Sequence, residues 1–340
     1  MSVGRPQRIL IICVSRIGDT LFATPAIRAI ATAHSEAEIT VLAHPKRAEV
    51  LEHLSFIAHV GHITKSRAAW LGWLPSRPFD LAFVFGFDES LVAYALRVAR
   101  RVVAFEQERA ALNLQIDTVV PRPAFQSEHA VHQLLRLPAT VGIPPAGLRI
   151  GFNVGADERA SARRRLEASG VATGRPLIGL QVASFPTKAY RDWPISYFTE
   201  LCERISARWP DARFLIFGGP EEKQRTARLK EQLDSRAALF AGRLSLRETG
   251  ALMSLTDLYI GVDTGPTHIM SAFDIPLVAL YHCVSPSGHT GPLEHPCAYV
   301  IDHPAGHRPD GEAIPMAEIS VNAVFAQVVR ALAEHPPQSR

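Results

Sequence analysis

The sequence predicts an α/β protein made of two doubly wound, Rossmann-like domains. A chain of 340 residues is too long for one ordinary domain and suits two. Short apolar runs alternate with helix-like segments in both halves, which is typical of parallel sheets covered by helices on both faces. Hydrophobic residues make up 47% of the chain and charged residues 20%, the profile of a soluble globular protein with apolar side chains for two cores.

The first half alternates regularly between strand-like and helix-like segments. Apolar runs bounded by turn residues predict strands at residues 9–14, 38–43, 59–63, 81–85 and 101–105. Helices are expected at residues 24–33, 47–55, 90–97 and 127–141. Pro25 suits the first turn of the earliest helix.

The second half repeats the alternation. Strands are expected at residues 177–181, 213–217, 238–240, 258–262 and 276–281, and helices at residues 157–169, 195–208, 221–233, 245–254 and 321–333. We therefore place one domain at residues 1–160, a second at residues 161–318, and a terminal helix at residues 319–335 that packs back on the first domain. Two such domains imply a central cleft, with sites at the carboxyl ends of both sheets.

The turn at residues 263–266 is the most informative local pattern. It joins an apolar run to a helix-like stretch within one βαβ unit. Thr264 or Asp263 can cap the helix, Gly265 allows close backbone approach, and His268 adds a donor in the first turn. The free N–H groups at this helix end would hold a phosphate. The alternative is a plain capped helix without a ligand.

A second polar turn follows the first strand and carries Gly18 and Asp19. Neither a dinucleotide fingerprint nor a P-loop is present, because the turn has a single glycine and no Gly-Lys-[Ser/Thr]. A carboxylate at a strand-to-helix turn can deprotonate a hydroxyl nucleophile. Taken alone, Asp19 is better explained as a helix cap. A base on one domain and a phosphate cradle on the other together suit group transfer from a diphosphate-linked donor to an alcohol.

Composition narrows the class of partner. The net charge of +3 is too mild to indicate nucleic acid, but it allows an anionic small molecule or an acidic membrane surface. No apolar run is long enough to cross a bilayer and residues 9–14 are too short for a signal peptide, so we expect a cytoplasmic protein. The four scattered cysteines lack metal-ligand spacing and are expected to be free thiols.

Five segments resemble the signatures of glycosyltransferase family 9, the heptosyltransferases of lipopolysaccharide core assembly. They lie, in family order, at residues 14–26, 188–194, 217–221, 239–248 and 263–268. The resemblance covers nearly the whole chain. It implies a GT-B fold and metal-independent, inverting transfer from a nucleotide-diphosphate sugar, typically ADP-heptose, without a cofactor.

The resemblance also implies roles for single residues. Asp19 matches the proposed base that activates the acceptor hydroxyl, and Asp263 matches a contact to the donor sugar. Glu221 or Glu222 would hold the ribose. The other donor-binding residues expected are Ser184, Thr187, Lys188, Arg191, Thr264, Gly265 and His268. The acceptor-side residues expected are Ser15, Gly18, Lys65 and Arg67.

Two departures from the family pattern concern the donor site. The family usually has Pro-Gly after the strand at residues 177–181, where this chain has Val-Ala-Ser. Its basic residue usually lies one or two positions before Trp-Pro, whereas Lys188 is separated from Trp193 by four residues that include Arg191. Either Lys188 or Arg191 can therefore be the diphosphate cation, and we favour Lys188. The alternative for each is an exposed loop charge.

Residues 65–77 combine basic residues with Trp70 and Trp73. The segment can rest on an anionic membrane or receive a phosphorylated glycolipid. The interpretation that we favour is a helix whose tryptophans pack inward, because large aromatic side chains are usually core residues.

Together these features predict a glycosyltransferase, peripheral on the cytoplasmic face of the inner membrane, that moves a sugar to a lipopolysaccharide-core or related glycolipid. The resemblance makes heptose the expected sugar. The alternatives are a nucleotide-sugar epimerase or hydrolase of the same architecture and a non-catalytic sugar-nucleotide-binding protein.

Overall fold

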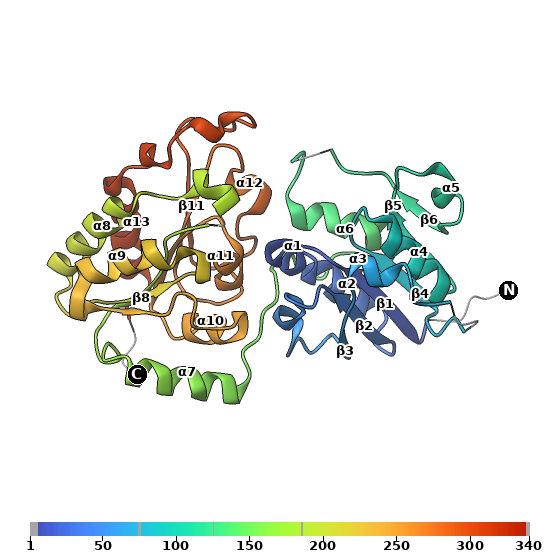
Figure 1. The fold of residues 1–340 in the computed structure, drawn as a ribbon, viewed down its shortest axis with the longest axis horizontal. Helices are drawn as coiled ribbons and strands as arrows, with labels where there is room; N and C mark the ends of the chain where they lie inside the picture. Colours follow the sequence, from blue (N-terminus) through green and yellow to red (C-terminus); the bar gives the residue numbers. More distant parts are fainter. Residues whose placement is uncertain (1–5, 74–75, 125, 185, 338–340) are drawn as a thin grey trace. The chain divides into compact units, whose positions relative to one another are not determined.

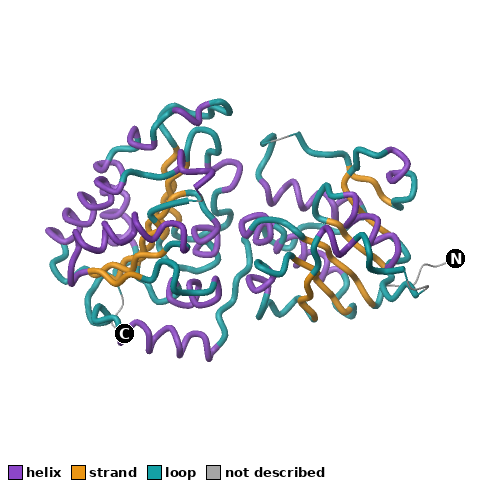
Figure 2. The backbone as a smooth tube through the Cα atoms, in the orientation of Figure 1, coloured by secondary structure: helices purple, strands orange, loops and turns teal. Residues whose placement is uncertain are grey.

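The protein divides into two compact units, residues 1–153 and 154–340. The structure is a computed structural model, and it describes residues 6–73, 76–124, 126–184 and 186–337 (Figure 1). Within these ranges each unit holds one six-stranded sheet in which all neighbouring strands run parallel. In each unit the strands gather in one layer with helices around them (Figure 2). The predicted fold class, α/β with two doubly wound domains, is confirmed.

The sheet of the first unit has the strand order β3-β2-β1-β4-β5-β6. Its strands are β1 (Arg8–Cys13), β2 (Glu38–Ala43), β3 (His59–His62), β4 (Leu81–Val84), β5 (Val102–Phe105) and β6 (Thr118–Val120). Its helices are α1 (Ile17–Phe22), α2 (Thr24–Ala33), α3 (Lys65–Ala68), α4 (Glu89–Val98), α5 (Ala110–Asn113) and α6 (Ala130–Thr140). Residues 9–12 of β1 are fully buried, because β1 is central and covered on both faces.

The second unit has the equivalent order, β12-β11-β10-β7-β8-β9. Its strands are β7 (Leu177–Gln181), β8 (Arg213–Phe217), β9 (Ala237–Leu239), β10 (Leu258–Val262), β11 (Leu277–Tyr281) and β12 (Ala298–Asp302). Its helices are α7 (Ala156–Ala168), α8 (Ile195–Arg208), α9 (Lys223–Leu233), α10 (Leu246–Met253), α11 (Gly265–Met270), α12 (Ser287–Thr290) and α13 (Val321–Glu334).

Both sheets contain a topological switch point. In the first unit the chain order reverses between β1 and β4, and in the second between β7 and β10. In sheets of this kind, ligands bind in the crevice beyond the carboxyl ends of the two strands at the switch. We therefore expect ligand sites at the segments after β1 and β4 and at those after β7 and β10.

Several local predictions were wrong. The helix expected at residues 47–55 is only a 3-10 turn at Ala48–Leu51, and the left-handed backbone of His53 (φ 63°) prevents its extension. The edge strands β6 and β12 were not predicted, because short, partly exposed strands lack continuous apolar runs. Helix α1 was also missed, since Gly18 weakens the helical signal.

The units do not follow the predicted boundaries. The first unit ends at residue 153, before the predicted residue 160, and α7 lies entirely in the second unit. Glu158 of α7 is held there by Arg247 of α10, with N···O distances of 2.8 and 2.6 Å. Helix α13 packs on α8 and β11 of the second unit.

The interpretation of Trp70 and Trp73 as inward-packing residues is also wrong. Their exposed fractions are 83% and 72%. Residues 74 and 75 of this segment lie outside the described residues. Across the part of the chain that the structure describes, no helix combines the length and apolar character needed to cross a membrane.

Candidate active site

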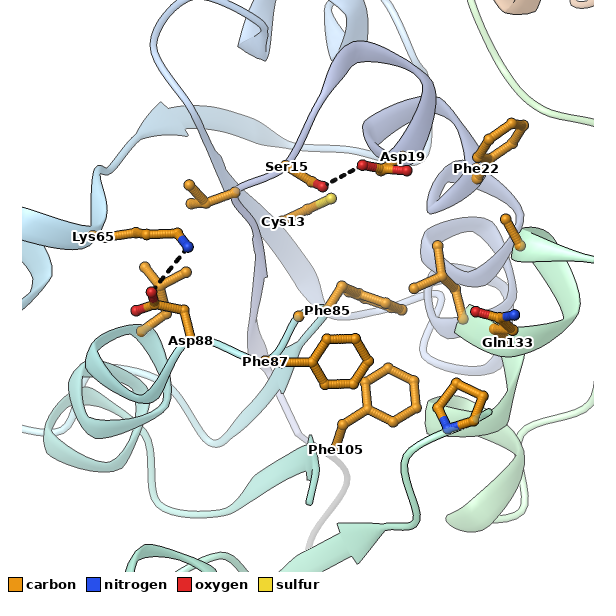
Figure 3. Close-up of a pocket in the computed structure, with 16 residues that line it drawn as sticks. Cys13, Ser15, Asp19, Phe22, Lys65, Phe85, Phe87, Asp88, Phe105 and Gln133 are labelled. Atoms are coloured by element: carbon orange, nitrogen blue, oxygen red, sulfur yellow. Dashed lines mark hydrogen bonds and ion pairs between the residues drawn. The ribbon is translucent and has the colours of Figure 1, made fainter. Parts of the chain in front are cut away.

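Asp19 lies just beyond β1, at the switch point of the first sheet. It is the third residue of α1, and the N-cap position belongs to Arg16, so the capping role considered for Asp19 is wrong. Its carboxylate accepts a hydrogen bond of 2.6 Å from the Ser15 hydroxyl (Figure 3). Arg47 donates to the Ser15 carbonyl at 2.9 Å and so fixes this turn. Gly18 precedes Asp19 in the helix. The Asp19 carboxylate is therefore exposed but held in place.

A pocket of about 450 Å³ opens beside Asp19. Its walls come from the segments after β1 and β4, as the switch point predicts, together with α6 (Figure 3). Most of the lining is apolar, with Phe22, Phe85 and Phe105 among the aromatic residues. Phe87 is about half exposed there. This volume is within the range of small-molecule sites, so the pocket can hold part of a small molecule next to the carboxylate.

Lys65 brings a positive charge to the pocket wall. Its Nζ lies 3.0 Å from Oδ2 of Asp88, the N-cap residue of α4 (Figure 3). The pair leaves Lys65 largely exposed, so its charge remains available to an anionic acceptor group. Arg67 is exposed on α3 and does not line this pocket. The structure therefore joins Ser15, Asp19 and Lys65 at one pocket and leaves Arg67 outside it.

In the second unit, Asp263 directly follows β10 and lies at the centre of a buried charge network. Its Oδ2 accepts a hydrogen bond of 2.7 Å from Arg191 Nη1, and its Oδ1 lies 3.3 Å from His268 Nε2. Burial acts to raise the pKa of the Asp263 carboxyl, but His268 and Arg191 outweigh burial and keep that pKa below its usual value. Asp263 is therefore a carboxylate, and it orients two donors.

Thr264 begins the phosphate-binding turn predicted from the sequence. It is the N-cap residue of α11, yet its side chain makes no capping hydrogen bond, so the capping role considered for Thr264 is wrong. Its Oγ1 is buried and has no hydrogen-bond partner among the described residues. Gly265 and Pro266 then open the helix. A buried hydroxyl without a partner is costly, which indicates that a ligand completes it.

The loop after β7 distinguishes the two candidate cations. Arg191 is paired with Asp263, and its Nε is buried without a hydrogen-bond partner in the described chain. Lys188 instead donates to the Tyr190 hydroxyl at 3.2 Å and lies 4.0 Å from Glu312. Thr187 is exposed on the same 3-10 turn, Pro186–Arg191. The geometry therefore favours Arg191, rather than Lys188, as the cation beside the turn at Thr264.

Asp192 holds this loop in shape, a role that the sequence did not reveal. Its Oδ1 accepts hydrogen bonds from the Ser184 N–H (2.6 Å) and the Ser184 hydroxyl (2.7 Å). Its Oδ2 is paired with Arg225 of α9. Burial raises the pKa of Asp192 although Ser184 and Arg225 act to lower it. Ser184 is thus a structural partner of Asp192. No local sequence pattern predicts the contact between Asp192 and Arg225, because that contact depends on how α9 packs.

Glu221 and Glu222 differ in their burial. Glu221 is exposed, whereas Glu222 is buried and its Oε2 has no hydrogen-bond partner within the described residues. Burial raises the pKa of the Glu222 carboxyl. A Cβ at Gly219 would lie only 2.8 Å from Glu222 Oε2, so glycine leaves room for this carboxylate. Glu222 is therefore the better candidate for a contact to hydroxyl donors.

The unsatisfied groups of Thr264, Arg191 and Glu222 follow neighbouring strands of one sheet. Thr264 follows β10, Arg191 follows β7 and Glu222 follows β8, in the sheet order β10-β7-β8. A hydroxyl and a guanidinium N–H suit the oxygens of a diphosphate, while a carboxylate needs hydroxyl donors such as those of a ribose. The chemistry of these groups therefore suits the two ends of a nucleoside diphosphate.

The comparison with known families decides the class of protein. The model of glycosyltransferase family 9 (heptosyltransferase) matches residues 87–312, which include Thr264, Arg191 and Glu222. The chain belongs to glycosyltransferase family 9. This confirms the resemblance found in the sequence, and membership makes the protein a transferase.

Individual relatives agree with the family assignment. The chain is 21% identical to lipopolysaccharide core heptosyltransferase OpsX of Haemophilus influenzae over 81% of this chain and 79% of that protein. It is 30% identical to lipopolysaccharide heptosyltransferase 1 of Pseudomonas aeruginosa, but over only 36% of each chain. The structure of the E. coli ADP-heptose lps heptosyltransferase II superposes with a TM-score of 0.78, at 19% identity, over 97% of this chain and all of that one. The fold is therefore that of the family 9 transferases, the GT-B type.

Proposed function

We propose that this family 9 glycosyltransferase moves a heptose from ADP-heptose to a hydroxyl of a lipopolysaccharide-core glycolipid. The observation that carries the proposal is the set of buried, unsatisfied groups on Thr264, Arg191 and Glu222. They suit a nucleoside diphosphate, and family membership supports heptose as the sugar that it carries. The names of the E. coli and Haemophilus influenzae relatives, an ADP-heptose heptosyltransferase and a lipopolysaccharide core heptosyltransferase, support ADP as the nucleotide and the lipopolysaccharide core as the acceptor.

The reaction is a single displacement that inverts the anomeric carbon. Asp19 takes the proton of the acceptor hydroxyl as the new C–O bond forms, and the bond between the anomeric carbon and the diphosphate oxygen breaks. The departing ADP carries the developing negative charge. Arg191, the Thr264 hydroxyl and the first N–H groups of α11 stabilise that charge, so this step needs no metal. Asp263 orients Arg191 and His268 towards the donor.

The acceptor binds in the pocket of the first domain. Ser15 orients the Asp19 carboxylate, Lys65 meets an anionic group of the acceptor, and the phenylalanine side chains contact its apolar faces. Because the acceptor is a glycolipid, we place the reaction at the cytoplasmic face of the inner membrane.

Titration calorimetry of the purified protein with ADP, GDP and UDP, each with and without EDTA, tests the donor assignment. We expect selective binding of ADP that EDTA does not change. Preference for another nucleotide would remove ADP-heptose as the donor, and EDTA-sensitive binding would remove metal independence. Absence of binding to all three would contradict the nucleotide site itself.

A further inference from the structure

The first domain carries an exposed aromatic surface that the reaction does not use. It consists of Trp70, Leu71 and Trp73, which we call the tryptophan patch. Leu71 is 39% exposed, and both tryptophans are far more exposed than that. Large aromatic side chains are usually well buried, and contiguous exposed apolar surface marks a site of interaction. The tryptophan patch is therefore a candidate interaction surface.

The tryptophan patch is held in a defined shape. Arg97 of α4 donates to the carbonyls of Leu71 (2.9 Å) and Ala68 (2.5 Å), and its guanidinium lies 4.6 Å from the centre of the Trp73 ring. Gly72 turns the chain with φ 78°, and a Cβ there would come within 2.8 Å of Val98. The aromatic side chains are thus presented by a braced turn, which lowers the entropic cost of binding.

The segment that carries the patch is basic. No Asp or Glu occurs between Glu52 and Asp80, whereas Lys65, Arg67 and Arg77 all lie in that interval. The side chains of Lys65, Arg67 and Arg77 are exposed. Tryptophan beside lysine and arginine is the composition of segments that bind at the interface of an anionic bilayer: the indole lies at headgroup depth while the cations meet lipid phosphates.

We propose that the tryptophan patch docks the enzyme on the surface of an anionic lipid bilayer. Charge complementarity and the braced, exposed indoles carry this proposal. Lys65, on the same segment, lines the pocket that holds Asp19 (Figure 3), so docking through the patch sets that pocket close to the lipid headgroups. That the bilayer also carries the acceptor rests on the proposed function, whereas lipid binding does not.

Vesicle sedimentation with the full chain tests the proposal without any substrate. The probes are phosphatidylcholine vesicles with and without phosphatidylglycerol. We expect binding to the phosphatidylglycerol vesicles that added salt weakens, and a loss of at least about tenfold in partitioning for the Trp70→Ala/Trp73→Ala double variant. The matched control is Leu114→Ala, because Leu114 is 88% exposed on the same domain outside the patch. Its binding stays at the wild-type level.

Fluorescence adds a readout that does not depend on a variant. Of the four tryptophans, Trp193 is fully buried and Trp209 partly buried, so quenching by brominated lipid reports Trp70 and Trp73. The proposal is overturned if the wild type ignores phosphatidylglycerol vesicles or if the double variant binds them as well as the wild type. It is also overturned if the wild type is a dimer and the double variant is a monomer, because a second copy of the chain then covers the patch. If the double variant transfers sugar to a lipid-free acceptor fragment at the wild-type rate, its loss of lipid binding is not a loss of catalysis. This result would distinguish a failure of docking from a failure of the proposed function.

Discussion

A substitution at Thr264 should change the affinity for the donor without changing the stability of the protein. The reason is that the buried Thr264 hydroxyl has no hydrogen-bond partner among the described residues. Thr264→Val keeps the shape of the side chain, and the extended backbone at this position (φ −148°, ψ 170°) suits a β-branched residue. Since no capping bond exists to lose, we expect the free energy of unfolding to stay within about 0.5 kcal/mol of wild type or to rise.

The same substitution removes a hydrogen bond to a charged phosphate in the complex. Such a bond contributes about 1.5–3 kcal/mol, so the affinity for ADP should fall roughly 10- to 150-fold. Titration calorimetry measures the affinity, and denaturant unfolding measures the stability of the same samples.

Thr267→Val is the matched control three residues later. The Thr267 hydroxyl donates to the Val262 carbonyl at 2.6 Å, so its loss should cost about 1–2 kcal/mol of stability while ADP affinity stays unchanged. The reasoning is refuted if Thr264→Val destabilises the protein as much as Thr267→Val and binds ADP like the wild type.

Four further substitutions test the donor site and the loop beside it. Arg191→Ala should weaken ADP binding by about 2 kcal/mol or more, roughly 30-fold, whereas Lys188→Ala should change it by less than about threefold; calorimetry showing the reverse order would restore Lys188 as the diphosphate cation. Burial raises the pKa of Glu222 above its usual 4.5, so the native state binds this proton more tightly than the unfolded state does. The wild type should therefore lose stability relative to Glu222→Gln as the pH rises from 4.5 through the raised pKa. ADP affinity of the wild type should increase over the same interval, because ribose hydroxyls donate to the ionised carboxylate. If the ADP affinities of the wild type and Glu222→Gln depend on pH in the same way, Glu222 is excluded as the ribose contact. Asp192→Asn should lower the free energy of unfolding by about 1 kcal/mol, since it removes the charge partner of the partly exposed Arg225. Wild-type stability of this variant in denaturant would contradict the role of Asp192 in holding the loop.

The strands that build the sites were predictable because they are buried on both faces. Residues 177–181, 213–217 and 258–262 form strands at the predicted bounds, since continuous apolar runs mark central strands of parallel sheets. Asp19 and Asp263 could be placed at the carboxyl ends of strands for the same reason. In a doubly wound sheet, that position already indicates a site.

Contacts between distant segments could not be predicted. Asp88 is the partner of Lys65 only because α4 follows β4 at the switch point, and Asp192 meets Arg225 only because α9 packs nearby. The choice between Glu221 and Glu222 depends on which side chain the turn after β8 buries. The exposure of Trp70 and Trp73 runs against the preference of aromatic residues for the core, and such exceptions arise where a surface has a partner.

The central claim is that Asp19 drives transfer of heptose from ADP-heptose to a lipopolysaccharide-core acceptor. The most direct measurement is the rate at which purified wild type and Asp19→Asn glycosylate such an acceptor, followed by mass spectrometry, with ADP affinity measured in parallel. We predict transfer by the wild type, a fall in kcat of about 10²- to 10⁴-fold in the variant, and equal affinity of both proteins for ADP. Transfer by the variant at the wild-type rate, or no transfer by the wild type, would contradict the account.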